Sequence, residues 1–215
     1  MALKSVQVDL SPLPLRTRPA FRLAQLLSGL VAYGVSMGLM VRAQLGLDPW
    51  DVLHQGLAER LGWSFGSITA LTGALVMLAW LPLRQRPGIG TVANVVVIAL
   101  AVDLTLALIP PLSALPAQIA LMVTAVVLNG LATAVYVGAR LGPGPRDGLM
   151  TGLHARTGWS VRVVRTTIEV CVLAVGWLLG GTVGVGTVLY AAAIGPLTQL
   201  FLKFAAVREK KDLCP

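Results

Sequence analysis

Few side chains in this sequence could do chemistry, and they gather in two short segments set between long apolar runs. The segments are residues 46–64 (GLDPWDVLHQGLAERLGWS) and residues 142–160 (GPGPRDGLMTGLHARTGWS). Asp51 and Asp147 occupy the same place in the two segments, and Arg146 directly precedes the second acid. A carboxylate at a helix start accepts hydrogen bonds from free backbone amides, and an arginine there attracts anions. These three side chains are therefore candidates for binding a solute.

A further pair of candidates lies within an apolar run. Glu169 is placed about 13 Å along a predicted helix from Ser160, at about 1.5 Å per residue, and Arg165 lies one turn earlier on the same face. Charged groups are costly in hydrocarbon and usually face a bundle interior or a cavity. Two interpretations stay open: an internal ion pair that eases insertion, or a proton or substrate site with Arg165 as its gate.

Polar side chains also recur at matching depths in the two halves of the chain. When the halves are aligned 96 residues apart, Asn94 takes the place of Tyr190, and Asn129 takes the place of Tyr33. Buried amides commonly join membrane helices by hydrogen bonds. The four residues therefore either link helices or line a central path.

No catalytic or metal-binding motif stands out. Asp51 lies near His54, and His154 stands alone, but neither histidine has a third suitable ligand nearby, so we expect no metal. The sequence contains no nucleotide-binding loop, nucleophile elbow or zinc-protease helix. We therefore expect no cofactor and no enzymatic activity.

The composition indicates an integral membrane protein. Of 215 residues, 56% are hydrophobic and 12% are charged, and the mean hydropathy is +0.80. The net charge of +8 could suggest a nucleic-acid partner, but such a partner needs a basic soluble surface, and this chain has little soluble surface. We expect the lipid bilayer as the main partner and no nucleic acid. Cys171 falls in an apolar run and Cys214 in the tail, so both thiols are predicted to be free.

Six apolar runs have about the 20 residues that a helix needs to cross a bilayer. They lie at 23–41, 64–83, 88–109, 116–139, 163–180 and 183–202. Residues 1–20 are predicted to be a disordered cytoplasmic tail, and residues 205–215 a second cytoplasmic tail. Lysine and arginine gather in the tails and at alternate connections, which places both termini in the cytoplasm.

The two short segments belong to a longer duplication. The sequence aligns with itself without a gap, at an offset of 96 residues, from Gly34 to Leu104. We therefore divide the chain into membrane repeats at 21–110 and 116–204. Each repeat has three spans, an odd number, so the second copy is predicted to be inverted. The predicted fold is an all-α polytopic membrane protein: six transmembrane helices as two inverted three-helix repeats, each with a short half-helix.

The half-helix of the first repeat is predicted at 49–61. At about 20 Å it is too short to cross the membrane, so it is either re-entrant or interfacial, and both remain open. Gly56 and Gly152 favour burial, because a glycine within a packed helix lets a neighbouring backbone approach.

One family shares these motifs. The segment GLDPWD at 46–51, repeated as GPGPRD at 142–147 and followed each time by Gly-Trp-Ser, resembles the YczE/YitT-type bacterial integral membrane proteins. The resemblance covers nearly the whole chain after residue 20. It implies an inner-membrane protein with transport as the expected activity, and it supplies no catalytic residues. Some relatives are encoded beside regulators built on a vitamin B6 enzyme fold, which hints at a metabolite near amino acids or vitamin B6. Trp50 stands where the second copy has Arg146, so an anion would meet an arginine on one side only.

Three function classes remain. The leading one is an inner-membrane transporter or exporter of a small solute, anionic or amino-acid-like, in which two inverted units rock around a site formed by the half-helices. The second is a passive facilitator with an aquaporin-like pair of half-helices. The third is a non-transporting membrane assembly factor, against which the short loops argue. The sequence leaves the oligomeric state open, a homo-oligomer included.

Overall fold

The structure is a computed structural model that describes residues 17–207, and this part of the chain contains helices and loops but no strand. The predicted tails at 1–20 and 205–215 lie outside the described residues except at their inner ends. The helices are α1 (Pro19–Ala43), α2 (Pro49–Leu61), α3 (Phe65–Leu83), α4 (Ile89–Leu108), α5 (Leu115–Gly138), α6 (Pro145–Thr157), α7 (Val161–Leu178) and α8 (Val185–Ala205).

Five of these helices are long and apolar enough to cross a membrane: α1, α3, α4, α5 and α8. They correspond to five of the six predicted spans. The run predicted at 163–180 forms α7, which has 18 residues and carries the charged side chains Arg162, Arg165 and Glu169. The all-helical, membrane-embedded character of the prediction is thus confirmed.

Side chains are distributed as in a protein that lipid surrounds. Large apolar side chains lie on the outer surface, including Leu100, Leu104 and Leu108 of α4, which are 60–71% exposed. Polar side chains such as Asn129 and Thr91 are fully buried. In water the exposed apolar faces would be costly, whereas hydrocarbon solvates them. The structure therefore fits a multi-pass membrane protein.

The helix boundaries repeat along the chain. Each helix in the first half begins 96 residues before a helix in the second half. The paired first residues are Pro19 and Leu115, Pro49 and Pro145, Phe65 and Val161, and Ile89 and Val185. The offset found in the sequence is therefore also an offset in the structure.

Left-handed backbone positions repeat with the same offset. Gln44 and Arg140 have φ of 57° and 56°, and they end α1 and α5. Gly62 and Gly158 have φ of 69° and 73°, and they end α2 and α6. Glycine takes this conformation at little cost, which explains why each Gly-Trp-Ser motif stops a helix.

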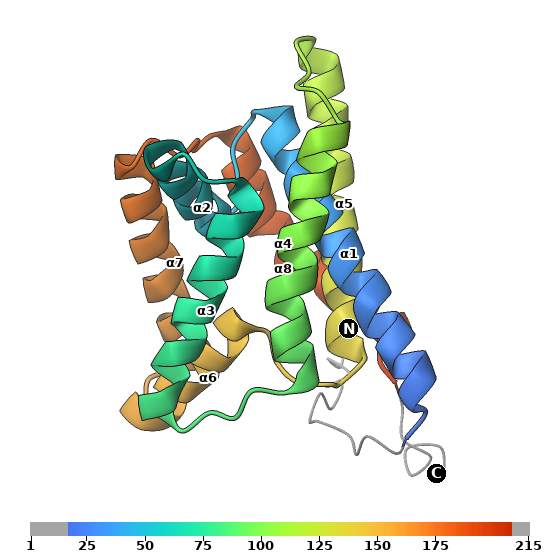
Figure 1. Ribbon diagram of the computed structural model, residues 1–215, viewed down its shortest axis with the longest axis vertical. Helices are drawn as coiled ribbons and strands as arrows, with labels where there is room; N and C mark the ends of the chain where they lie inside the picture. The colour runs from blue at the N-terminus through green and yellow to red at the C-terminus, as the bar shows by residue number, and fades with distance from the viewer. Residues whose placement is uncertain (1–16, 208–215) are drawn as a thin grey trace, which may run out of the picture.

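The short helices α2 and α6 lie toward opposite ends of the molecule (Figure 1). Each has 13 residues and begins with a proline at its first position, where a missing N–H costs nothing. Their length is about 20 Å, less than the roughly 30 Å of a bilayer core. Neither helix can cross a membrane by itself.

Each short helix packs against the opposite half of the chain. The long helices α1 and α5 form the centre, with α4 against α1 and α8 against α5, while α2 packs on α7 and α6 packs on α3. The loops cross in the same way. The backbone amide of Gly186 donates to the Leu45 carbonyl at 2.8 Å, and the amide of Gly90 donates to the Leu141 carbonyl at 3.1 Å. The two halves are therefore interlocked through equivalent contacts.

Small residues permit this interlocking. Gly176 of α7 touches the backbone of α2 at Leu53, and Gly148 of α6 touches the ring of Trp80 on α3, so a methyl group at either glycine would overlap its neighbour. Gly56 and Gly152 are buried as predicted, and the first lies against Leu179. The prediction that both short helices are packed rather than exposed along their glycine faces is confirmed.

One pair of helices packs differently in the two halves. α3 packs along α4, and Gly66 and Gly73 leave room for this contact against Ala99 and Val95. Among the described residues, the equivalent helices α7 and α8 do not pack closely against each other. The wall of the bundle is thus closed on one side and open on the other.

Candidate functional site

A cavity of about 940 Å³ lies inside the bundle, and all eight described helices contribute to its wall. The first residues of both short helices line it, at Pro49 and Trp50 in α2 and at Pro145 and Arg146 in α6. Their last residues, Leu61 and Thr157, are exposed. Both N-terminal ends therefore meet at the cavity, where their partial positive charge favours negative groups.

Asp48 caps the N-terminus of α2. Its Oδ1 atom accepts hydrogen bonds from the backbone amides of Trp50 at 2.8 Å and Asp51 at 2.9 Å. The sequence offers an aspartate before Pro49 as a cap and Asp51 as a second acceptor for the free amides, and the structure shows these hydrogen bonds at Asp48. The Asp51 carboxylate is therefore available for other contacts.

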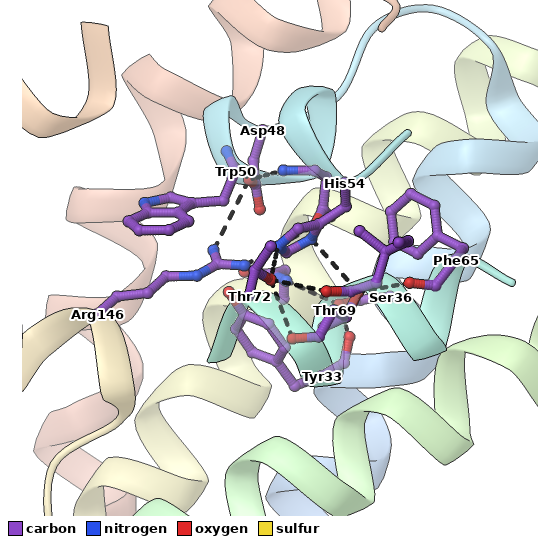
Figure 2. Close-up of polar contacts among 12 residues, drawn as sticks. Tyr33, Ser36, Asp48, Trp50, His54, Phe65, Thr69, Thr72 and Arg146 are labelled. Atoms are coloured by element: carbon purple, nitrogen blue, oxygen red, sulfur yellow. Dashed lines mark hydrogen bonds and ion pairs between the residues drawn. The ribbon is translucent and has the colours of Figure 1, made fainter. Parts of the chain in front are cut away.

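Asp51 pairs with a buried histidine instead. Its Oδ1 atom lies 3.1 Å from His54 Nδ1, one turn along α2. The other ring nitrogen, His54 Nε2, lies 2.8 Å from the Thr72 hydroxyl of α3 (Figure 2). Thr69 Oγ1 lies 3.3 Å from Nδ1. The carboxylate and the imidazole are both buried, with 0% and 2% exposure.

This chain of contacts can hold or release one proton without moving a heavy atom. The Thr72 hydroxyl lies 2.9 Å from the Ile68 carbonyl, and it has only one hydrogen to donate. If the hydroxyl donates to the Ile68 carbonyl, His54 Nε2 carries a hydrogen and donates it to Thr72. The contact between Asp51 Oδ1 and His54 Nδ1 then needs a second proton, on one of these two atoms. If it turns to donate to His54, Nδ1 carries the hydrogen and Asp51 is ionised. The two arrangements differ by one proton.

Arg146 of α6 reaches into this acidic cluster from the other half of the chain. Its Nη1 and Nη2 atoms lie 3.8 Å from Asp48 Oδ1 and 3.9 Å from Asp51 Oδ1. The guanidinium carbon lies 4.9 Å from the centre of the Trp50 ring, within the range of a cation–π contact. Figure 2 shows the Arg146 side chain below the Trp50 indole, with its guanidinium toward Asp48.

Both carboxylates keep an unused oxygen. Oδ2 of Asp48 and Oδ2 of Asp51 are buried and have no hydrogen-bond partner among the described residues, and the same is true of the Trp50 indole nitrogen. Buried polar atoms normally find partners, so three such atoms in one place are unusual.

Burial also changes the acidity of these groups, which lie on or before α2 and not on a long apolar helix. Burial raises the pKa of Asp51 to about 7, against the lowering effect of Arg146. Burial and the Asp51 charge raise the pKa of Asp48 to about 6, again opposed by Arg146. One proton can therefore come and go near neutral pH.

The predicted polar residues of the long helices form a second network. Asn129 Nδ2 donates to Ser36 Oγ at 2.8 Å, and the Tyr190 hydroxyl donates to Asn129 Oδ1 at 3.2 Å. Tyr33 packs edge-on against Tyr136, with ring centres 5.9 Å apart. These contacts join α1, α5 and α8, while Tyr33 and Tyr190 also line the cavity.

Arg165 and Glu169 form the ion pair that their spacing predicts, at 2.8 Å between Nε and Oε1. Both residues line the cavity, but their side chains are 52% and 31% exposed. The pair lies on α7, at the open wall of the bundle. The main buried charge cluster is elsewhere, at Asp48, Asp51 and Arg146.

Two more predicted site residues, Asp147 and Asn94, line the cavity, whereas Asp51 and Asn129 are fully buried and are not part of its lining. Asp147 hydrogen-bonds the backbone of Gly144, the residue that caps α6, so here the predicted role at the helix start is found. Asn94 of α4 contributes to the wall. Asp103, at the far end of α4, accepts hydrogen bonds from Ser64 and from the Gly66 amide, which fixes the start of α3.

Sequence reasoning missed several members of the site. Asp48, His54, Thr69 and Thr72 were not chosen, although a signal for them exists. Asp51 and His54 are three residues apart on one helical face, as are Thr69 and Thr72 within an apolar span, and helical neighbours at this spacing can share a partner. No group of three or more His, Cys, Asp or Glu side chains suited to a metal occurs in residues 17–207.

The fold and the site define a polytopic α-helical membrane protein with an internal cavity that charged and polar side chains help to line. Residues 20–203 match a family of unknown function (DUF6198), and the chain belongs to this family. It is 42% identical to an uncharacterized protein of Haemophilus influenzae over 181 residues, which cover 84% of this chain and 83% of that protein.

Two proteins of Bacillus subtilis are also similar. The uncharacterized membrane protein YczE is 38% identical over 177 residues, which cover 82% of this chain and 80% of YczE. The uncharacterized protein YyaS is 24% identical over 178 residues, which cover 81% of this chain and 89% of YyaS. The resemblance to YczE-type proteins is thus confirmed. No solved structure matches the chain.

Proposed function

We propose that this protein is a carrier that moves a small, anionic or amino-acid-like solute across the bacterial inner membrane. The observation that carries the proposal is the cavity, where the N-terminal ends of two short helices from different halves of the chain meet. Half-helix ends that face an enclosed cavity are a common way to build solute sites in transporters.

In this proposal the two halves are inverted copies, α7 is the sixth span, and both termini are cytoplasmic. Three features support it: the helix starts recur after 96 residues, α2 and α6 lie toward opposite ends of the molecule (Figure 1), and each short helix packs on the opposite half. An odd number of spans in each copy requires the inversion.

The short helices are re-entrant in this arrangement. Trp50 in α2 and Pro145 in α6, both in the first turn, are buried at the cavity, and irregular backbone within a membrane is tolerated only where protein or water covers it. An interfacial helix would instead present a whole apolar face to lipid. The closely packed Gly176 and Gly148 contacts support insertion into the bundle.

The unequal walls of the bundle support alternating access. The cavity reaches Arg84, Arg86 and Arg140, at connections that the positive-inside rule assigns to the cytoplasm. The seam between α3 and α4 is closed, and the seam between α7 and α8 is not. The structure would then be an inward-facing state, and its counterpart would close α7 on α8 while opening α3 from α4.

Each site residue has a place in this mechanism. Trp50, Asp51, Arg146 and Asp147 would hold the solute between the half-helices. Tyr33, Asn94, Asn129 and Tyr190 would line or brace the path, and the ion pair of Arg165 and Glu169 would act at the opening.

Uptake by proteoliposomes tests this function. Vesicles containing the full chain would receive radiolabelled amino acids, organic acids and simple amines one by one, with protein-free vesicles as the blank. A carrier gives uptake that saturates with concentration and that Asp51→Asn abolishes.

The same vesicles distinguish the carrier from a facilitator. A channel gives flux that rises linearly with concentration, and an aquaporin-like channel also speeds osmotic shrinking in stopped flow. No uptake of any solute, together with water permeability equal to the blank, would contradict both.

A further inference from the structure

We propose that the primary ammonium group of an amine-bearing solute binds at Asp48, which lines the cavity, and at Asp51, which is buried next to it, in exchange for a proton. The inference deepens the proposed function, because it names the chemical class of the solute and the ion exchanged for it. It concerns binding, however, and can be tested without transport.

The charges of the site leave room for one more cation. Asp48 and Asp51 would carry two negative charges when both are ionised, and Arg146 supplies one positive charge within 4 Å of them. His54 is buried next to Asp51 and is neutral, because burial lowers its pKa to about 3. A buried uncompensated charge is strongly unfavourable. One proton or one monovalent cation completes the balance.

The hydrogen-bonding atoms indicate what kind of cation fits. The Oδ1 atoms of Asp48 and Asp51 already meet backbone amides, His54 or Arg146, whereas both Oδ2 atoms are buried without a partner. A primary ammonium group has three N–H donors and no acceptor, so it can satisfy two acceptors at once. A quaternary ammonium group has no N–H donor and would leave both oxygens unsatisfied.

The surroundings already accommodate a cation. The Trp50 ring forms one wall beside the acids, and the Arg146 guanidinium lies on it (Figure 2). The ring attracts an ammonium group as it attracts a guanidinium. The arginine side chain is 26% exposed, and its ion-pair distances of 3.8 and 3.9 Å are longer than hydrogen bonds. Arg146 can therefore shift within the cluster and leave room for a cation that binds the acids more closely.

The proton that the amine replaces lies in the Asp51–His54–Thr72 chain. Charged and titratable groups from several helices line the cavity next to this chain: Asp48 before α2, Arg146 and Asp147 on α6, Tyr33 on α1, Tyr136 on α5 and Tyr190 on α8. Asp48 and Asp51 have a pKa of about 6 and about 7, so they change charge near neutral pH. Binding of R–NH₃⁺ to the protonated site then yields the complex and one free H⁺.

Thermal unfolding of the full chain purified in detergent tests the proposal, with n-butylammonium as the probe. A ligand of the folded state raises the midpoint by mass action. We expect a saturable rise with n-butylammonium chloride, and no rise with equal concentrations of tetramethylammonium chloride, sodium chloride or sodium butyrate.

The pH dependence identifies the exchanged ion. Below the Asp51 pKa of about 7, a competing proton weakens apparent amine affinity about tenfold per pH unit. In weakly buffered solution near pH 6, a pH indicator should report release of about one proton per amine bound.

Matched variants locate the site. Asp48→Asn and Asp51→Asn should each weaken n-butylammonium about tenfold or more, because each removes a charge-assisted acceptor. Asp103→Asn removes a carboxylate outside the cavity and should bind the amine as the unsubstituted chain does. Arg146→Gln should keep amine binding but lower the proton release, because the two acids without the arginine can hold the amine and one proton together.

Clear results would overturn the proposal. Equal stabilisation by tetramethylammonium or sodium would show that N–H donors are not required. Stabilisation by butyrate that Arg146→Gln abolishes would show an anion site. If the variants do not fold, pH-independent amine binding by the unsubstituted chain is sufficient to reject the exchange.

The two proposals can fail separately. Amine binding without saturable uptake would contradict the carrier but leave this site intact. Saturable uptake of another solute without amine binding would contradict this site but leave the carrier intact.

Discussion

The short helices α2 and α6 share a backbone but not a chemistry. Both have 13 residues, begin with proline and end at a left-handed glycine. At the cavity, however, α2 is preceded by a capping aspartate and α6 by a glycine, Asp48 and Gly144. The next difference is Trp50 against Arg146, two residues that stack on each other in the structure.

The two halves differ in the side chains that face the cavity and not in their helix ends. Helix ends and turns, which the fold needs, are the same in both. The side chains that meet in the cavity are different, and each supplies what the other lacks: acids and an aromatic face from α2, a cation from α6. A site built between two copies in this way is asymmetric even though its framework is repeated.

The long helices that follow show the same pattern of divergence. Gly66 and Gly73 of α3 correspond to Arg162 and Glu169 of α7. The glycines allow α4 to approach, whereas the charged side chains keep α7 polar along its exposed face. The closed and open walls of the cavity therefore have a cause in the sequence.

The largest predicted difference between the copies concerns their acids. Asp51→Leu should destabilise the folded state by about 3–5 kcal/mol, because it leaves buried His54 without its carboxylate and partly buried Arg146 with one acid, Asp48, instead of two. Asp147→Leu should cost about 1 kcal/mol, the loss of a helix-start hydrogen bond. Thermal or denaturant unfolding of the purified variants measures both. Equal losses would show that the two acids have the same role.

A smaller difference is expected where the packing is interchanged. Gly148 of the short helix α6 packs against the Trp80 ring of α3. At the equivalent positions the glycine is on the longer helix, where Gly176 of α7 packs against Val52 of α2. Gly148→Val should therefore cost about 1–3 kcal/mol through overpacking. Combining it with Trp80→Ala should cost less than the sum of the single changes, which a double-mutant cycle measures. Gly195→Ala, at a glycine with open space around it, is the control. Strict additivity would contradict the proposed contact.

The smallest effect on stability is expected at Glu169. Its ion pair with Arg165 is partly exposed and lies at the open wall, so Glu169→Gln should change the free energy of unfolding by about 0.5 kcal/mol or less. Unfolding midpoints of Glu169→Gln and Asp51→Asn, measured side by side, give the ranking. A larger loss at Glu169 would place the main buried charge on α7 and not on α2.

Much of this architecture could be predicted from the sequence because it depends on local chemistry. Apolar runs fix the long helices, Pro49 and Pro145 mark the starts of the short ones, and Gly62 and Gly158 mark their ends. The 96-residue offset predicted which elements correspond. These features need only neighbouring residues to be recognised.

The centre of the site could not be predicted in the same way because its contacts join distant parts of the chain. Arg146 reaches Asp48 across nearly half the sequence, and Thr72 reaches His54 from another helix. The sequence could not divide the capping role between Asp48 and Asp51, since both stand near the free amides and only their geometry separates them. Glu169 drew attention because it lies within an apolar run, but it faces the open side of the cavity.

The opposite placement of the two short helices is the central claim, and cysteine labelling tests it most directly. Leu61→Cys and Thr157→Cys lie at equivalent, exposed ends of α2 and α6, and each would be introduced singly into a chain carrying Cys171→Ser and Cys214→Ser. In intact spheroplasts, a membrane-impermeant maleimide should label position 61, and it should label position 157 only after permeabilisation. Labelling of both positions from the same side would contradict the inverted arrangement and the carrier built on it.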